Sequence, residues 1–172
     1  MGKITYICGG ARSGKSTFAL SIAKKQKGKI AFIATCEPKD REMKERIVLH
    51  KASRPKCWQT FEEPRDITSV LNKIGPKFKT IIIDCVTLWI TNLMVKNNKN
   101  TSVETKMKII LNTIKRIDAD CIIVTNEVGL GIVPNNKMAR EFRDISGRIN
   151  QMIAQRSVTA YFMASGIPWR IK

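Results

Sequence analysis

The chain has 172 residues, of which 43% are hydrophobic and 26% charged, and its 31 basic and 14 acidic side chains give a net charge of +17. This length and composition predict a single globular domain over residues 1–172. No apolar run approaches the ~18 residues of a membrane span, the N-terminus lacks a signal-peptide pattern, and the five cysteines are too scattered for a zinc site or a disulfide framework, so we expect a cytoplasmic protein.

Lysine dominates the positive charge, with 20 lysines against 11 arginines. The basic residues are spread along the chain, and no basic stripe studded with aromatic residues, which would stack nucleobases, is present in the sequence. We therefore expect a lysine-rich surface that favours polyphosphate substrates, and no nucleic-acid partner.

The first elements alternate between strand and helix patterns. Residues 3–8 and 29–35 are short apolar runs typical of buried strands, and residues 15–25 between them carry apolar side chains at helical spacing. Residues 39–52 predict a charged helix that ends before Pro55, because proline disfavours helical geometry at the residue before it. The predicted apolar stripe of that helix consists of Met43, Ile47 and Val48.

The middle of the chain begins with a loop and a short helix near residues 66–74, followed by a β-branched strand at 79–84. An apolar segment at 85–95 leads to the polar stretch KNNKNTS, residues 96–102, which predicts a variable or disordered loop. Ser102 is expected to cap a helix that extends to about Ile117.

The last third of the chain keeps the same alternation. A strand at 119–125 and a loop rich in glycine and proline precede a helix at 137–155. The runs 158–164 and 167–172, joined by a tight Ser-Gly turn, predict an antiparallel strand pair. Continuous apolar strands that alternate with helices predict an α/β protein, with a mostly parallel sheet covered by helices on both faces.

The segment GGARSGKS follows the first strand directly and satisfies the P-loop pattern G-x-x-x-x-G-K-[ST]. Backbone N–H groups of such a loop surround phosphate oxygens, and its lysine and the following helix N-terminus add positive charge. Asp84 ends a strand, where P-loop proteins keep the acidic residue for Mg²⁺, so we predict a nucleotide site with Ser16 and Asp84 as the Mg²⁺ ligands. The predicted nucleotide-binding residues of the loop are Gly9, Gly10, Ala11, Arg12, Ser13, Gly14, Lys15 and Ser16.

His50 is the only histidine of the chain, and Lys51 and Arg54 lie close to it in the sequence. A lone histidine is more often a surface or packing residue than a catalytic one. A neutral imidazole is nevertheless a nucleophile, and neighbouring cations stabilise the negative charge that develops at an attacked phosphate. The cluster is therefore consistent with attack by His50 on a nucleotide phosphate.

Eight segments together resemble one known family in order and spacing: GGARSGKS (9–16), FIAT (32–35), ERIVLHKASRP (45–55), WQTFE (58–62), DCVTLWITNLM (84–94), TNEVGLGIVP (125–134), FRDISGRINQ (142–151) and SGIP (165–168). The family is the bifunctional adenosylcobinamide kinase / adenosylcobinamide-phosphate guanylyltransferase of cobalamin biosynthesis. The resemblance implies a RecA-like P-loop fold, usually a homotrimer, and two reactions. In the first, ATP or GTP phosphorylates adenosylcobinamide. In the second, GTP gives GMP to that phosphate through a GMP-histidine, here at His50, to form adenosylcobinamide-GDP and pyrophosphate.

The resemblance also implies that further residues line the GTP site around the P-loop and Asp84. They are Ala34, Thr35, Cys36, Lys51, Ala52, Ser53, Arg54 and Glu62. Glu62 could accept hydrogen bonds from guanine or from a ribose hydroxyl, and the sequence leaves both open. Asn126 and Glu127 follow a strand, where open α/β sheets bind ligands, so we assign them to the cobinamide side. Helical spacing predicts plain surface ion pairs for Arg143, Asp144 and Arg148.

Two other functions are also compatible with these residues. A RecA-like ATPase that acts on nucleic acid would share the P-loop and the positive charge, and it would show salt-sensitive oligonucleotide binding. A simple small-molecule kinase would use the P-loop alone. In that enzyme His50 would be incidental, and replacing it would leave the activity unchanged.

Overall fold

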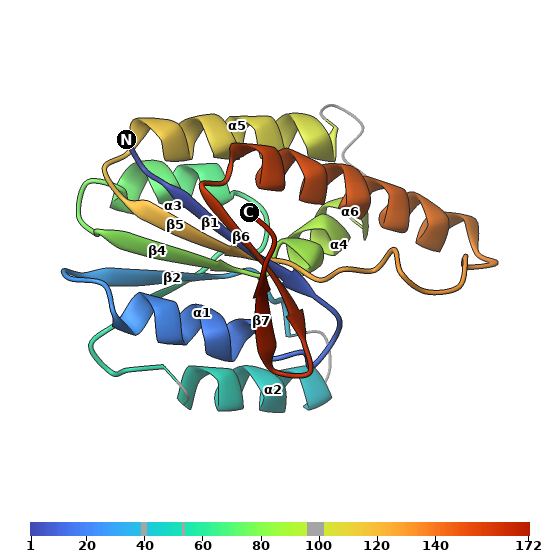
Figure 1. Cartoon of the computed structure of the whole chain (residues 1–172), viewed down its shortest axis with the longest axis horizontal. Helices are drawn as coiled ribbons and strands as arrows, with labels where there is room; N and C mark the ends of the chain where they lie inside the picture. The colour runs from blue at the N-terminus through green and yellow to red at the C-terminus, as the bar shows by residue number, and fades with distance from the viewer. Residues whose placement is uncertain (39–40, 53, 96–101) are drawn as a thin grey trace.

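The structure is a computed structural model that describes residues 1–38, 41–52, 54–95 and 102–172, except the side chains of Glu42 and Arg46. Within these residues the core is a seven-stranded sheet of order β3-β2-β4-β5-β1-β6-β7 (Figure 1). The strands are β1 (Ile4–Gly9), β2 (Ile30–Ala34), β3 (Gln59–Glu62), β4 (Thr80–Asp84), β5 (Asp120–Val124), β6 (Thr159–Ala164) and β7 (Ile167–Arg170). All neighbours pair in parallel except β6 and β7, which confirms the predicted sheet.

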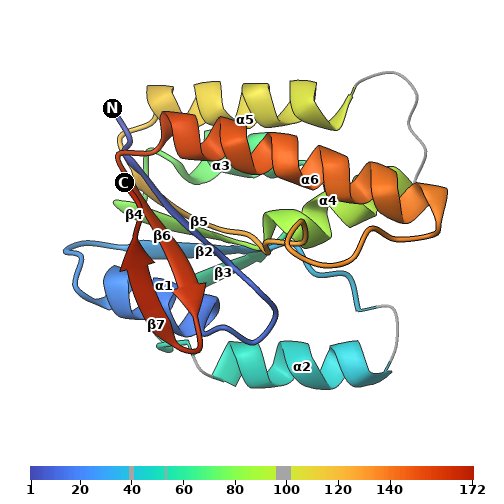
Figure 2. The same cartoon turned by 45° about the vertical axis from the view of Figure 1, so that its right-hand side comes forward.

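Helices cover both faces of the sheet, as predicted. They are α1 (Lys15–Lys24), α2 (Arg41–Ala52), α3 (Ile67–Ile74), α4 (Val86–Val95), α5 (Val103–Arg116) and α6 (Lys137–Arg156). Figures 1 and 2 show α1 and α2 below the sheet, and the other four above it. Successive strand residues point to opposite faces, so Tyr6 packs in the apolar core shared with α3–α6 and Ile7 in the core shared with α1.

Side-chain caps fix the starts of several helices. Ser102 Oγ accepts a hydrogen bond from Thr105 N at 3.1 Å and begins α5, as predicted. Asn136 Oδ1 accepts from Ala139 N at 3.3 Å at the start of α6. Residues 96–101, for which we expected a variable loop, lie outside the described part of the chain. Among the described helices, none combines the length and the apolar character that crossing a bilayer requires.

Two elements differ from the prediction. The segment expected to be a loop contains β3, a four-residue strand at the edge of the sheet, in which Gln59 and Glu62 are exposed, Thr60 and Phe61 are half-buried, and no apolar run occurs. The apolar stripe of α2 is narrower than predicted, since Val48 is 64% exposed, whereas Met43 and Ile47 are half-buried. Both elements lie at the periphery, where a segment can keep its secondary structure without burying a full face.

Asn92 on α4 forms hydrogen bonds with the two segments that follow β2 and β3. Its side chain is 4% exposed, and its Nδ2 donates to the carbonyls of Thr35 (2.8 Å) and Pro64 (3.2 Å). Asn92→Ala leaves both carbonyls without this donor, so we expect the free energy of unfolding in urea to fall by about 2–3 kcal/mol. Thr91→Ala removes a half-buried hydroxyl from the same helix and should cost less than about 1 kcal/mol. Equal losses in the two variants would contradict this role of Asn92.

Candidate active site

The carboxyl ends of the parallel strands bring the predicted site residues together. In the register of the sheet, Ala34 at the end of β2 lies between Glu62 of β3 and Asp84 of β4. The P-loop, residues 9–16, follows β1 at the same edge and leads into α1. Parallel strands place their carboxyl ends on one side, so segments distant in sequence form one surface.

The P-loop gathers polar groups around its centre. The Lys15 side chain is buried, with 7% of its surface exposed, and its ammonium group donates to the Gly10 carbonyl and to Ser13 Oγ. Burial lowers the pKa of Lys15, and the neighbouring Cys85, Asp84 and Cys8 oppose that effect. The lysine is thus held beside the loop backbone that would surround a phosphate.

The C-terminal hairpin packs against this loop. Gly166, in the turn between β6 and β7, donates its N–H to the Ser13 carbonyl at 3.0 Å. Gly14 has a φ of 92°, and a Cβ there would lie 3.1 Å from the Cα of Gly166. Only glycine takes this backbone conformation without strain. The glycine that the P-loop motif requires at position 14 therefore also permits the close contact with the hairpin.

Ser16 and Asp84 form the predicted pair of hard oxygen donors. Ser16 Oγ donates a hydrogen bond to Asp84 Oδ2 at 2.8 Å. Burial raises the pKa of Asp84, while the Ser16 hydrogen bond and the charges of His50, Arg54 and Lys15 lower it. In the described part of the chain no three His, Cys, Asp or Glu side chains cluster as a metal site. One carboxylate and one hydroxyl nevertheless suit Mg²⁺, which commonly completes its shell with phosphate and water oxygens.

His50 lies in the last turn of α2, exposed, and its charge acts on Asp84. Arg54 anchors the segment after this helix: its guanidinium lies 3.6 Å from the centre of the Phe32 ring, and its Nη1 donates to Thr60 Oγ1 at 3.2 Å. Burial lowers the pKa of Arg54, and neighbouring carboxylates oppose that effect. The anchor therefore holds the histidine end of α2 close to β2 and β3.

Lys51 and Glu62 meet in an ion pair between α2 and the end of β3. Their side chains are 47% and 60% exposed, so the pair contributes little to stability. In this arrangement the Glu62 carboxylate accepts from Lys51, and both side chains remain accessible at the edge of the site.

The other residues predicted for the GTP site follow β2 and end α2. Thr35 is buried, and its hydroxyl donates to the Cys85 carbonyl at 2.7 Å and accepts from Cys85 N at 2.9 Å. Cys36 is half-buried and Ala52 is exposed, each next to a residue already placed at the site. Ser53 lies outside the described residues.

Asn126 and Glu127 follow β5 beside the P-loop. The backbone N–H of Glu127 donates to the carbonyl of Gly9, the first P-loop residue, at 2.9 Å. The Glu127 carboxylate accepts from Gly129 N at 2.6 Å and from Asn150 Nδ2 at 3.5 Å. The carboxylate therefore has a defined orientation at the same edge as the P-loop.

Comparison with known proteins decides the family. The family model described as cobinamide kinase / cobinamide phosphate guanyltransferase matches residues 5–171. The chain belongs to this family. It is therefore an enzyme of cobalamin biosynthesis with kinase and guanylyltransferase activities, which confirms the expectation from the sequence motifs.

Curated relatives match this enzyme over nearly their full length. The bifunctional adenosylcobalamin biosynthesis protein CobP of Pseudomonas aeruginosa is 35% identical over 96% of this chain and 95% of its own. The corresponding proteins named CobU are 35% identical in Salmonella typhimurium and 33% identical in Escherichia coli, each over 96% of this chain and 98% of the relative. The similarity therefore extends over nearly the whole of each chain.

Two solved structures show the fold. A prototypical ATPase from the type III secretion system of pathogenic bacteria has a TM-score of 0.55 and 13% identity, over 94% of this chain and 51% of its own. The RadB recombinase has a TM-score of 0.52 and 14% identity, over 93% of this chain and 73% of its own. They confirm the RecA-like P-loop class and, at such low identity, carry no argument for an ATPase acting on nucleic acid.

Helix α6 corrects one sequence prediction. Arg148 forms an ion pair with Glu104 at 2.9 Å, and Asp144 is exposed. Arg143 instead turns inward, where its Nη2 donates to the Gly129 carbonyl at 2.6 Å and its buried Nη1 has no hydrogen-bond partner within the described structure. Helical spacing predicted a surface pair for Arg143 because it cannot show that the loop after β5 folds over this part of the helix.

A buried polar network behind Asn126 was missed in the sequence. Asn150 of α6, 6% exposed, accepts from Thr125 Oγ1 at 3.1 Å and donates to the Asn126 carbonyl at 3.3 Å. Thr87 Oγ1 accepts from Asn126 N at 2.7 Å. The available signal was a polar residue on the helix face that carries Ile149 and Ile153, and the network joins three segments: α6, α4 and the residues after β5.

Proposed function

We propose that His50 of this enzyme carries GMP from GTP to adenosylcobinamide phosphate, and that the P-loop serves both this reaction and the phosphorylation of adenosylcobinamide. The supporting observation is the position of the only histidine, in the last turn of α2, near enough to Asp84 to lower the pKa of that carboxyl, which accepts a hydrogen bond from the P-loop residue Ser16. A nucleophile beside a phosphate-binding loop suits attack at an inner phosphate, and the loop itself suits transfer of the outer one.

The guanylyl transfer takes two displacements. A neutral nitrogen of His50 attacks the α-phosphorus of GTP, an N–P bond forms, and the bond to pyrophosphate breaks. A phosphate oxygen of adenosylcobinamide phosphate then attacks the same phosphorus, which forms adenosylcobinamide-GDP and releases the imidazole. The cations Lys51 and Arg54 stabilise the charge that develops on the phosphate and on the leaving pyrophosphate.

The nucleotide is proposed to lie along the row of strand ends. P-loop N–H groups would bind its phosphates, with Lys15 moving from the Gly10 carbonyl to the outer phosphates. Ser16 and Asp84 would hold Mg²⁺, which when bound neutralises phosphate charge. The remaining proposed contacts of the nucleotide are Ala34, Thr35, Cys36, Lys51, Ala52, Ser53, Arg54 and Glu62.

Asn126 and Glu127 are proposed to face the cobinamide substrate. In the kinase reaction the substrate hydroxyl attacks the outer phosphorus and loses its proton, and Glu127 is oriented beside the P-loop to accept it. Glu127→Gln is expected to lower kcat for phosphorylation of adenosylcobinamide about 100- to 1000-fold. Labelling of the protein by GTP without acceptor should change less than about three-fold, because that step needs no proton acceptor at this position.

The matched control is Glu141→Gln, which removes an exposed carboxylate from α6 and should leave both steps unchanged. Equal losses of phosphorylation and of labelling in the Glu127 variant would show that the residue acts through the fold of the loop. Steady-state phosphorylation and single-turnover labelling are the two measurements.

We also infer that the enzyme is a homotrimer of single nucleotide-binding domains, residues 1–172, in a reducing cytoplasm. The loop after β5 and the start of α6 support subunit contact, because large apolar side chains there are mostly exposed: Leu130 (80%), Ile132 (96%), Val133 (64%) and Met138 (63%). The five cysteines are free thiols, which suits a reducing compartment. Light scattering at several protein concentrations tests the trimer.

A two-stage labelling experiment tests the role of His50. The protein is incubated with MgCl₂ and GTP labelled at the α-phosphate, denatured, and examined for label that is acid-labile and stable to base, as a phosphoramidate is. A second sample receives adenosylcobinamide phosphate before denaturation, and its label should move to a small molecule. Wild-type protein that acquires no label would overturn the GMP-histidine proposal.

A further inference from the structure

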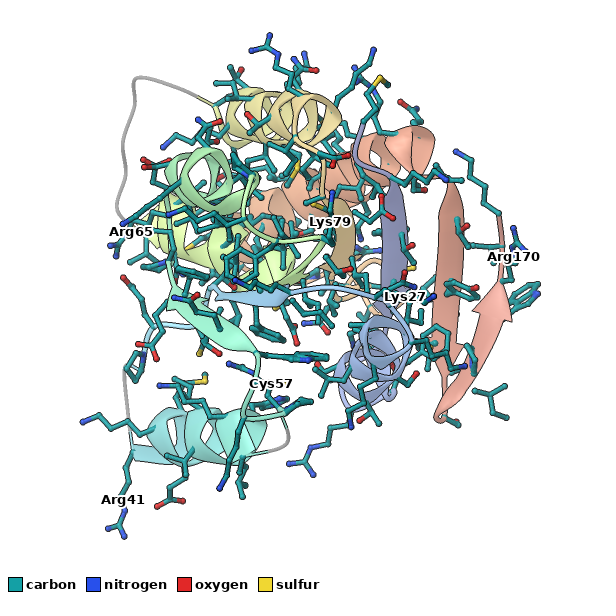
Figure 3. All side chains as sticks on the ribbon, turned by 90° about the vertical axis from the view of Figure 1, so that its left-hand side faces the viewer. Lys27, Arg41, Cys57, Arg65, Lys79 and Arg170 are labelled. Carbon is teal, nitrogen blue, oxygen red and sulfur yellow. The ribbon has the colours of Figure 1, made fainter. Side chains whose placement is uncertain are left out.

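The edge of the sheet opposite the active site carries many lysines that the proposed function does not use. This edge contains the starts of β1, β2, β4 and β5, and Figure 3 looks onto it and labels Lys27 and Lys79 there. Its exposed lysines, here named the lysine face, are Lys3, Lys24, Lys25, Lys27, Lys29, Lys77 and Lys79. Two exposed aspartates, Asp118 and Asp120, lie among them. Positive charge therefore predominates on this face.

Contacts between the loops make the lysine face one continuous surface. Lys79 N donates to the Lys29 carbonyl at 2.9 Å, and its ammonium group pairs with Asp118. Asp120 accepts from Lys3 N at 2.9 Å and donates its own N–H to the Lys79 carbonyl at 2.9 Å. A hollow of about 560 Å³ between these loops is lined by Lys25, Gln26, Lys27, Lys79, Thr80, Asp118 and Asp120.

Helix dipoles explain only part of this charge. Helices of an α/β sheet end at the edge where the strands begin, and a cation in the last turn, such as Lys24 in α1, complements the negative end of the dipole. Lys27, Lys29 and Lys77 lie in loops beyond the helices. Within the described structure no ion pair joins these three to an acid. Their charge is therefore available to a partner.

We propose that the lysine face binds the surface of an anionic lipid bilayer and leaves the active-site edge directed away from the membrane. Clustered lysines suit a diffuse anionic surface, since each acts as a flexible point charge, whereas arginine supplies the bidentate contacts that read phosphates individually. The inference stands on charge and placement, and does not depend on the role of His50.

Apolar residues at the same edge favour a bilayer over a nucleic acid. Met1 is 80% exposed beside Gly2, whose N–H donates to the Ile117 carbonyl at 2.9 Å, and Val158, just before β6, is 59% exposed. Such side chains enter the headgroup region of a bilayer. The one aromatic residue of segments 24–29 and 75–79, Phe78, is only 7% exposed and offers no platform for stacking bases.

The test is sedimentation of the full-length protein with vesicles. Wild type is expected to bind vesicles of phosphatidylcholine with 30% phosphatidylglycerol in 50 mM NaCl, to release them in 500 mM NaCl, and not to bind pure phosphatidylcholine. The variant K27Q/K29Q/K77Q should partition roughly 100-fold more weakly. The control K44Q/K108Q/K137Q removes the same charge from exposed lysines elsewhere and should partition within about three-fold of wild type.

Lys27→Gln alone should weaken binding several-fold, and thermal unfolding of each variant shows that the fold is retained. Wild type that fails to bind the anionic vesicles would overturn the proposal. Equal losses in the two triple variants would also overturn it, because net charge and not this face would then set binding. A labelled 30-base-pair DNA duplex is the competing ligand: duplex binding that depends on the same lysines, at a salt concentration where vesicles are not bound, would assign the face to nucleic acid.

Discussion

His50→Ala is expected to abolish transfer of label from α-labelled GTP to the protein, with a residual rate at least about 1000-fold below wild type. The chain has no second histidine that could replace the nucleophile. The side chain is exposed, so its removal leaves no cavity, and the melting temperature should stay within about 2 °C of wild type. Formation of adenosylcobinamide-GDP should fall in parallel with labelling, because the second displacement starts from the labelled histidine.

The kinase reaction shows whether the effect of His50→Ala is confined to guanylyl transfer. Phosphorylation of adenosylcobinamide by His50→Ala should stay within about three-fold of wild type, because the histidine attacks only the inner phosphate. Leu49→Ala truncates the preceding residue, which is 70% exposed, and should retain both activities. A His50→Ala variant that still forms adenosylcobinamide-GDP at the wild-type rate would make the histidine incidental and revive the simple P-loop kinase for this site.

Asp84→Asn is expected to lower activity and raise stability at the same time. The substitution keeps an oxygen that can accept from Ser16 but removes the charge proposed to hold Mg²⁺. We expect both reactions to slow about 100- to 1000-fold and the Mg²⁺ concentration for half-maximal activity to rise. Asp144→Asn, which neutralises an exposed aspartate, is the control and should leave both quantities unchanged.

The stability change follows from the raised pKa of Asp84. The folded protein binds this proton more tightly than the unfolded chain does, so ionised Asp84 opposes folding at every pH above its ordinary pKa of about 3.9. That cost grows as the pH rises from the ordinary value to the raised folded-state value and is constant above it, and asparagine removes it. At pH 7 we expect a melting temperature about 2–4 °C above wild type, measured by calorimetry. Below about pH 4 the gain should disappear, and a gain that persisted there would need another cause.

The central strands and the P-loop were predictable because their determinants are local. β1, β2, β4 and β5 are buried on both faces, so each is a continuous apolar run, and the glycine spacing of the P-loop is required by its own backbone. β3 was missed because an edge strand of four residues needs no such run. Burial of Val48 was predicted from helical spacing, which shows a shared face but not whether anything packs on it.

The site was predictable as a set of residues but not as a set of contacts. The Ser16–Asp84 hydrogen bond could be expected from two motifs that P-loop proteins combine. The Arg54 contacts with Phe32 and Thr60, and the Asn150 network, depend on which loops meet at the edge of the sheet. Which loops lie next to each other depends on the packing of the whole chain, and the residue spacing within one element does not predict it.

Because Gly166 contacts Ser13, the order in which the chain is synthesised should affect when it can bind its ligand. The P-loop leaves the ribosome before the hairpin that supports it, because the other five strands and all six described helices precede β6 in the chain. A nascent chain that stops before β6 has every residue of the P-loop motif and lacks the backbone that braces it. Retention of nascent chains on immobilised GTP should therefore begin only when the hairpin of β6 and β7 has emerged.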